Sequence, residues 1–126
     1  MRSLKTPQIR GIQAHFSGLN AESVAARLLK QQGLEILAHR LKTPCGEIDL
    51  VVSDSQWLIA VEVKQRRTLQ ESATSLTARQ SQRLLAAFDY VLQTRPDWHR
   101  PSTRFDLIIV DQQGSARRIQ DALRQF

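Results

Sequence analysis

The sequence is short of cysteine, and it lacks both a long apolar run and a secretory signal. Its single thiol, Cys45, cannot form an internal disulfide, which excludes a disulfide-stapled scaffold and fits a reducing compartment. No apolar run approaches the ~20 residues that a membrane crossing needs. The absence of acids before Glu22 leaves a transit peptide open, although a basic arm is the simpler interpretation. We therefore expect a cytoplasmic protein.

The sequence also lacks several signatures of enzyme chemistry. It has no Gly-rich phosphate loop, and His15, His39 and His99 are too scattered to match a metal-ligand spacing. These histidines are expected to be solvated or to pack in the core. No catalytic partner lies near Cys45 in the sequence, so a buried or idle thiol is favoured over a nucleophile.

The composition that is present is typical of one ordinary globular domain. The chain has 126 residues, of which 41% are apolar and 24% are charged. The net charge is +6, and positive residues cluster at 64–67, 95–104 and 117–118. Such clusters favour a polyanionic partner, because Lys and Arg that neutralise phosphates release condensed counterions. The alternative, that the charge only keeps the protein in solution, stays open.

Apolar periodicity and turn residues predict an α/β layer structure, in which a mixed central sheet is flanked by helices. We expect residues 1–17 to form a basic, flexible arm and residues 18–126 to form one domain. Asn20 is expected to cap the first helix, and Gly33 to end it. The predicted elements are a helix over 20–32, strands over 34–41, 48–52 and 57–63, a loop over 65–75, a helix over 76–94, a buried strand over 103–110, a short strand over 117–119 and a terminal helical turn.

The hairpin formed by the second and third strands carries charges at its open end. A turn at 54–56 with an even number of loop residues places Asp49 opposite Glu62 and Glu47 opposite Lys64. One face of this hairpin is then wholly apolar and belongs in the core: Ile48, Leu50, Val52, Trp57, Ile59, Val61 and Val63. The other face is apolar near the turn and charged at the open end.

Convergence of Asp49 and Glu62 is costly as pure structure, because cross-strand carboxylates repel each other. A divalent metal site would explain it, since Mg²⁺ takes one or two carboxylates together with waters and phosphate oxygens. Lys64 would then stabilise negative charge that develops in a transition state. The alternative is an exposed sheet end with a Glu47–Lys64 ion pair that contributes ~0–1 kcal/mol. The spacing alone leaves both open.

Four motifs stand out in the sequence: G-x-x-A-E-x-x-A at 18–25, GEIDLV at 46–51, VEVKQR at 61–66 and RFD at 104–106. Together they resemble the YraN-type family of small bacterial proteins in the PD-(D/E)xK nuclease superfamily, which has the restriction-endonuclease-like fold. The resemblance covers residues 18–126, and GEIDLV followed by VEVK at this interval is its most specific part. It implies a restriction-endonuclease-like core with the order α-β-β-β-α-β and a short extra C-terminal strand or helix.

The resemblance also implies roles for individual residues. Asp49 and Glu62 would hold the metal, the backbone carbonyl of Val63 would complete its shell, and Lys64 would be the catalytic lysine. Glu22 would be an auxiliary carboxylate, although an acid that stabilises the first helical turn is an equal alternative. Glu47 is expected to have a structural or supporting role. Arg104 and Asp106 are expected to form a framework ion pair.

One position departs from the family pattern, which usually has a lysine where this chain has Gln80. Gln80 lies four residues before Leu84 on the core-facing stripe of the second long helix, so it should point toward the sheet. A glutamine can hydrogen-bond a phosphate or a carboxylate, but it brings no charge. We include Gln80 among the candidate catalytic residues and expect activity that is weaker, differently directed or absent.

We therefore expect a Mg²⁺- or Mn²⁺-dependent endonuclease that acts on DNA rather than RNA, with branched or damaged DNA as the substrate suggested by analogy. Trp57 and Trp98 could stack on bases, with a core role favoured for Trp57. The alternatives are a non-catalytic nucleic-acid-binding domain and a protein-interaction module, and a homodimer fits cutting of both strands. Nucleic-acid binding is assigned to Arg66, Arg67, Arg79 and Arg83.

Overall fold

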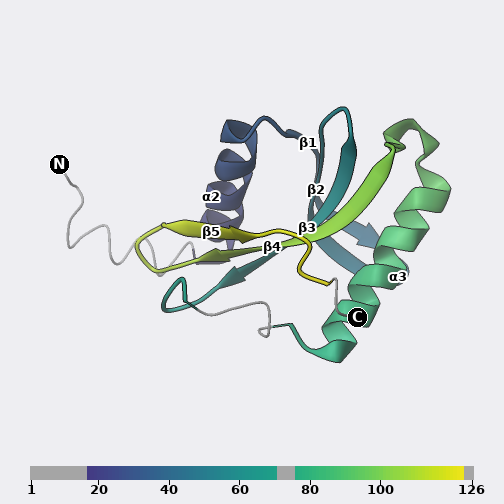
Figure 1. Cartoon of the computed structure of the whole chain (residues 1–126). Helices are drawn as coiled ribbons and strands as arrows, with labels where there is room; N and C mark the ends of the chain where they lie inside the picture. Colours follow the sequence, from purple (N-terminus) through teal and green to yellow (C-terminus); the bar gives the residue numbers. More distant parts are fainter. Residues whose placement is uncertain (1–16, 71–75, 124–126) are drawn as a thin grey trace.

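The computed structural model describes residues 17–70 and 76–123, and their element order matches the expected α-β-β-β-α-β (Figure 1). A 3₁₀ turn, η2, and a short final strand complete this order. The elements are α2 (Ser17–Gln31), β1 (Glu35–Thr43), β2 (Gly46–Ser53), β3 (Trp57–Gln65), α3 (Ala78–Thr94), η2 (Pro96–Trp98), β4 (Ser102–Val110) and β5 (Ala116–Ile119). Most of the predicted N-terminal arm and part of the predicted loop lie outside the described residues.

The five strands form one mixed sheet in the order β1-β2-β3-β4-β5. β3 and β4 run parallel, and the other neighbours are antiparallel. A parallel pair needs a crossover, and α3 lies within the connection between β3 and β4. Figure 1 shows α2 on one side of the sheet and α3 on the other. The prediction of a mixed sheet flanked by helices is confirmed.

Both faces of the sheet are buried, whereas the sequence pattern placed only one face of the hairpin firmly in the core. Leu50, Val52, Ile59 and Val61 pack against α2, as expected. The opposite face near the turn packs against α3 and forms a second cluster: Val51, Leu58 and Ala60 with Ala87, Phe88, Val91 and Trp98. Ile48 belongs to this second cluster and not to the face of Leu50, so strict alternation fails at the open end of the hairpin.

The first helix begins earlier than its predicted cap. α2 starts at Ser17, so Asn20 lies inside the helix, and the prediction of a cap at Asn20 is wrong. Cap preferences are weak beside the burial of an apolar face, and residues 17–19 contain no proline that would oppose a helix start before Asn20. The predicted end is confirmed. Gly33 has a φ of +90°, and the backbone N–H of Leu34 donates to the carbonyl of Leu29 (3.0 Å).

The predicted register of the β2–β3 hairpin is confirmed along its paired length. Ser53 lies opposite Leu58, Val51 opposite Ala60 and Leu50 opposite Val61. The Asp54 side chain accepts the backbone N–H groups of Gln56 and Trp57 (both 2.8 Å), which holds the turn. The regular ladder ends at Leu50 and Val61, and the charged residues lie directly beyond that point.

Candidate metal and nucleic-acid site

Asp49 and Glu62 lie one position beyond the last ladder pair, on neighbouring strands. A carboxylate oxygen of Asp49 accepts the backbone N–H of Val63 at 2.8 Å, so the side chain takes the place of a ladder acceptor. The charges of Asp49 and Glu62 interact, and both side chains line the same hollow. The expected convergence of the two carboxylates is therefore present.

The environment of Asp49 disfavours its charged form. Burial, followed by the nearby charge of Glu62, raises the pKa of Asp49 to about 7, and the N–H of Val63 only partly opposes this. The Glu22 carboxylate adds a smaller effect in the same direction. Two carboxylates therefore share a site in which one of them is partly protonated at neutral pH, an arrangement that a bound cation would stabilise.

Lys64 forms an ion pair with Glu62, at 3.1 Å, and both side chains are 17% exposed. Residues two apart on a strand share a face, which brings the ammonium beside the carboxylate of its own strand. The alternative considered from the sequence was a Glu47–Lys64 pair, and the geometry differs from it because the ladder has ended before that position. The ammonium consequently lies next to the Asp49–Glu62 pair.

The two carboxylates border a hollow of about 230 Å³ beside α3. Three acidic side chains and two polar or basic ones line it, with a glycine and a leucine completing the wall. The lining residues are Gly46, Glu47, Asp49, Glu62, Gln80, Arg83 and Leu84. Cations and phosphate groups are the ligands that such a mixed polar lining can bind.

Gln80 faces this hollow, as expected, but it has a second role that the sequence analysis missed. Its side-chain oxygen accepts the N–H of Thr77, and the Thr77 hydroxyl accepts the N–H of Gln80, both at 3.0 Å. This reciprocal capping box begins α3. The pattern Thr-x-x-Gln at 77–80 was a sufficient signal for it. Gln80 therefore fixes the start of the helix beside the site.

Gly46 begins β2 where the β1–β2 turn passes α3. Its φ of +145° is one that side-chain-bearing residues rarely adopt, and an added Cβ would lie 4.0 Å from the Cβ of Arg83. The Thr43 hydroxyl accepts the N–H of Gly46 (3.1 Å) and donates to its carbonyl (2.7 Å). The glycine of GEIDLV thus allows the turn that carries Glu47 and Asp49 to the hollow.

Glu22 comes from α2 and lies near this acidic group, although it does not line the hollow. The Arg40 guanidinium on β1 donates from Nε to Glu22 at 2.9 Å, with side chains 48% and 19% exposed, respectively. Arg40 is not among the site residues predicted from the sequence. Its ion pair spans 18 positions and two elements, and no local pattern in the sequence could have indicated it.

The four arginines assigned to nucleic-acid binding come from two segments. Arg83 lines the hollow, and Arg79 lies one helical turn earlier on α3, exposed. Arg67 is exposed just after β3. The Arg66 backbone N–H donates to the carbonyl of Val110 (2.9 Å), and its guanidinium donates to the carbonyl of Gln65 (2.9 Å). The structure thus brings Arg83 to the carboxylates and places the others on nearby segments of the chain.

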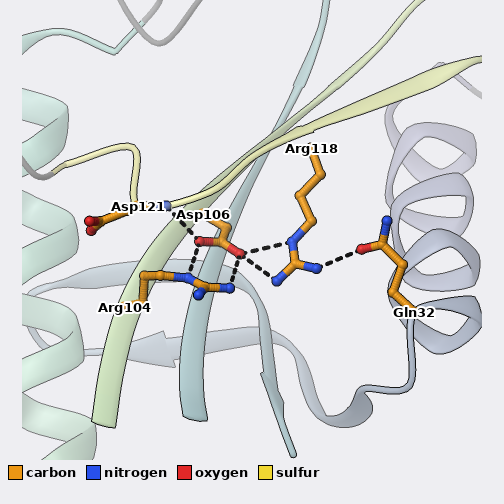
Figure 2. A network of polar contacts seen from close by, with 5 residues as sticks. All are labelled: Gln32, Arg104, Asp106, Arg118 and Asp121. Atoms are coloured by element: carbon orange, nitrogen blue, oxygen red, sulfur yellow. Dashed lines mark hydrogen bonds and ion pairs between the residues drawn. The ribbon is translucent and has the colours of Figure 1, made fainter.

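Arg104 and Asp106 form the expected framework ion pair, which is part of a larger network (Figure 2). The buried Asp106 carboxylate lies 2.8 Å from Arg104 and 2.8 Å from Arg118, and it accepts the backbone N–H of Asp121 at 3.0 Å. Arg118 also donates to the side-chain oxygen of Gln32 at 2.6 Å. This network joins β4, β5, the C-terminal turn and the end of α2.

The two tryptophans pack in the core, whereas Cys45 and two of the histidines are exposed. Trp98 is buried in the second core cluster, and the Arg95 guanidinium lies 3.8 Å from its ring centre, so the alternative of base stacking is wrong for Trp98. Trp57 packs on the core cluster between α2 and the sheet, which contains Leu50 and Ile59, as expected. Cys45, His39 and His99 are exposed, and His15 lies outside the described residues.

The donor groups at the site determine which metals it could bind. Within residues 17–70 and 76–123, no group of three or more His, Cys, Asp or Glu side chains gathers closely enough to hold an ion. That excludes a protein-only zinc site among the described residues. Two converging carboxylates beside an open hollow fit Mg²⁺ or Mn²⁺, because Mg²⁺ keeps several waters and phosphate ligands.

The molecule is a mixed α/β protein in which the acidic ends of two neighbouring strands lie beside an arginine-bearing helix. The sequence profile of the uncharacterised protein family UPF0102 matches residues 21–110, which include all five candidate catalytic residues. The chain belongs to this family, and the YraN-type prediction is confirmed. No helix in the described part of the chain is long and apolar enough to cross a membrane.

Similar bacterial proteins match most of the chain. A UPF0102 protein of Granulibacter bethesdensis is 47% identical over 116 residues, which cover 92% of this chain and 73% of the relative. One of Azorhizobium caulinodans is 42% identical over 118 residues, with 93% and 90% covered. One of Acidiphilium cryptum is 44% identical over 98 residues, with 78% and 77% covered.

The raised pKa of Asp49 predicts a pH-dependent stability of the metal-free protein. An acid whose pKa is higher in the folded state stabilises the fold at low pH, and this contribution is lost as pH rises from about 4 to about 7. Urea unfolding in EDTA should therefore show wild type losing stability between about pH 4 and pH 7 relative to Asp49→Asn. Parallel pH profiles for the two proteins would contradict this account of the site.

Proposed function

We propose that this protein is a Mg²⁺- or Mn²⁺-dependent nuclease that hydrolyses phosphodiester bonds in DNA. The observation that carries the proposal is the convergence of Asp49 and Glu62 at the open end of the hairpin, with Lys64 beside them. In the absence of a bound ligand this arrangement is unfavourable, because it buries like charges together. Binding a divalent cation and a phosphate would account for its cost.

Each residue of the site has a distinct role in the proposed reaction. Asp49 and Glu62 hold the cation, which when bound supplies Lewis-acid activation of water and of the scissile phosphate. The N–H of Val63 fixes the Asp49 carboxylate in place. The Lys64 ammonium, next to Glu62, stabilises the negative charge that develops on the phosphate. Arg83 lines the same hollow and is suited to binding a phosphate oxygen of the strand.

The order of the elements supports the finer assignment to the PD-(D/E)xK superfamily and its restriction-endonuclease-like fold. In such a fold an acid of one strand and an E-x-K of the next strand share one end of a mixed sheet, as Asp49, Glu62 and Lys64 do here. By analogy with resolvases and repair nucleases we expect branched or damaged DNA as substrate, and a fold does not by itself fix a function.

A second candidate is a non-catalytic nucleic-acid-binding domain on the same scaffold. Gln80 favours it, because a neutral side chain engaged in the α3 cap lines the hollow where the family usually has a lysine. A protein-interaction module is the third candidate, and DNA binding that weakens steeply with log salt concentration would disfavour it.

The test is a cleavage assay on labelled single-stranded, duplex, flap and four-way-junction DNA, with a single-stranded RNA alongside. Each substrate is incubated with Mg²⁺, Mn²⁺ or EDTA. Metal-dependent cutting would support the nuclease and reveal the preferred substrate shape, and paired cuts on both strands would indicate a dimer. Tight binding without cutting under any metal would leave the binding domain as the better account.

A further inference from the structure

Arg40 is the residue that the site contains but the proposed mechanism does not use. It lies on β1 between the pairs His39–Leu50 and Leu41–Ile48, which places it opposite Asp49 on β2. Its φ of +48° falls in the left-handed region that favours glycine and asparagine over other residues. Backbone strain of this kind is often associated with functional sites.

Stability does not account for an arginine at this position. The side chain is 48% exposed, and its ion pair with Glu22 is therefore screened by solvent and contributes little to folding. An arginine in a left-handed conformation is itself unfavourable. The residue thus adds local strain without a compensating gain in the fold, so its charge is better explained by a partner.

The acidic residues around Arg40 stabilise its positive charge. Hydrogen bonding to Glu22, and to a lesser degree the charges of Glu47 and Asp49, raises the pKa of Arg40 above its ordinary value. Only its Nε donates to Glu22, and within the described part of the chain its two terminal nitrogens donate no hydrogen bond. A guanidinium held through Nε keeps its outer nitrogens available for a phosphate.

We propose that Arg40 binds a phosphate group of the nucleic acid and that Glu22 positions Arg40 for this contact. This inference rests on the proposed function of the same site, and it assigns Glu22 a role other than metal binding. Lys64 and Arg83 approach the carboxylates from β3 and α3, whereas Arg40 approaches from β1. A strand that crosses the site would then meet positive charge on both sides of the acidic pair.

The test is metal-free binding of fluorescein-labelled single-stranded DNA by anisotropy, in EDTA and over a range of salt concentrations. Arg40→Asn is the informative variant, because asparagine adopts the left-handed conformation readily and the fold should be retained. It is expected to weaken binding roughly threefold to tenfold and to lower the slope of log affinity against log salt by about 0.7. The control is Arg27→Gln, which removes an exposed positive charge on α2 and should leave the slope unchanged.

Glu22→Ala separates positioning from simple electrostatics. Removal of a negative charge beside the site should tighten DNA binding, whereas loss of a positioning residue should weaken it. We expect weaker binding with Arg40 present and no weakening in the Arg40→Asn background. Tighter binding in both backgrounds would overturn the positioning role, and an Arg40→Asn slope equal to that of wild type would overturn the phosphate contact. Wild type that binds no DNA in EDTA and cuts none of the labelled substrates with Mg²⁺ or Mn²⁺ would instead overturn the proposed function itself.

Discussion

Replacing Glu62 with glutamine is expected to lower kcat/KM for metal-dependent DNA cleavage by roughly 10²–10³-fold or more. The substitution keeps the shape of the side chain and its ability to accept from Lys64, but it removes the negative charge that would hold the cation. Lys64→Met, which keeps most of the side-chain length, should have an effect of similar size through kcat. Both are measured on the DNA substrate that wild type cuts best.

The control for this experiment is Glu35→Gln. Glu35 is an exposed glutamate at the start of β1, opposite Ser53 and far along the strand from the open end of the hairpin. The Glu35→Gln variant should cleave DNA at the wild-type rate, and circular dichroism should show that all of the variants are folded. Glu62→Gln activity within about threefold of wild type would exclude Glu62 as a metal ligand, because losing a ligand charge costs far more.

Replacing Asp106 with alanine is expected to lower the free energy of unfolding by about 3–5 kcal/mol. Asp106 is the shared carboxylate of Arg104 and Arg118, whose side chains are only 14% and 10% exposed. Its removal leaves two mostly buried cations without their counter-ion. It also releases the N–H of Asp121 and loosens the connection from β5 through Arg118 to Gln32 (Figure 2).

Urea unfolding followed by circular dichroism measures this effect. Asp97→Ala is the matched control, because its ion pair with Arg95 has a similar separation of 3.1 Å but is exposed and screened by solvent, so its loss should cost far less than the loss of Asp106. Asp106→Asn keeps the side-chain shape without its charge and should fall between the two. Equal losses for Asp106→Ala and Asp97→Ala would show that the network does not support the fold.

The features that could be predicted from the sequence are those that a short pattern determines. Alternation of apolar residues and an even-length turn were enough to place Asp49 beside Glu62, because side chains of a strand repeat every two residues. Gly33 marked the end of α2 for a similarly local reason. The same alternation misplaced Ile48, because the ladder between β2 and β3 ends at Leu50 and Ile48 lies outside it.

Long-range contacts account for most of what the sequence did not show. The ion pairs of Arg40 with Glu22 and of Arg118 with Asp106 join residues from different elements, and only folding brings them together. The partner of Lys64 also depended on where the strands separate. The capping box at Thr77 and Gln80 was different, since its pattern was visible and only its significance was missed.

Binding of Mn²⁺ in the absence of DNA tests most directly the central claim that Asp49 and Glu62 form a divalent-metal site. Isothermal titration at pH 7.5, supported by the electron paramagnetic resonance of free Mn²⁺, would compare wild type, Asp49→Asn, Glu62→Gln and the control Glu35→Gln. One ion should bind to wild type and to the control, with an affinity at least ~10-fold weaker in both site variants. Equal affinity in all four proteins, or binding to none of them, would contradict the site.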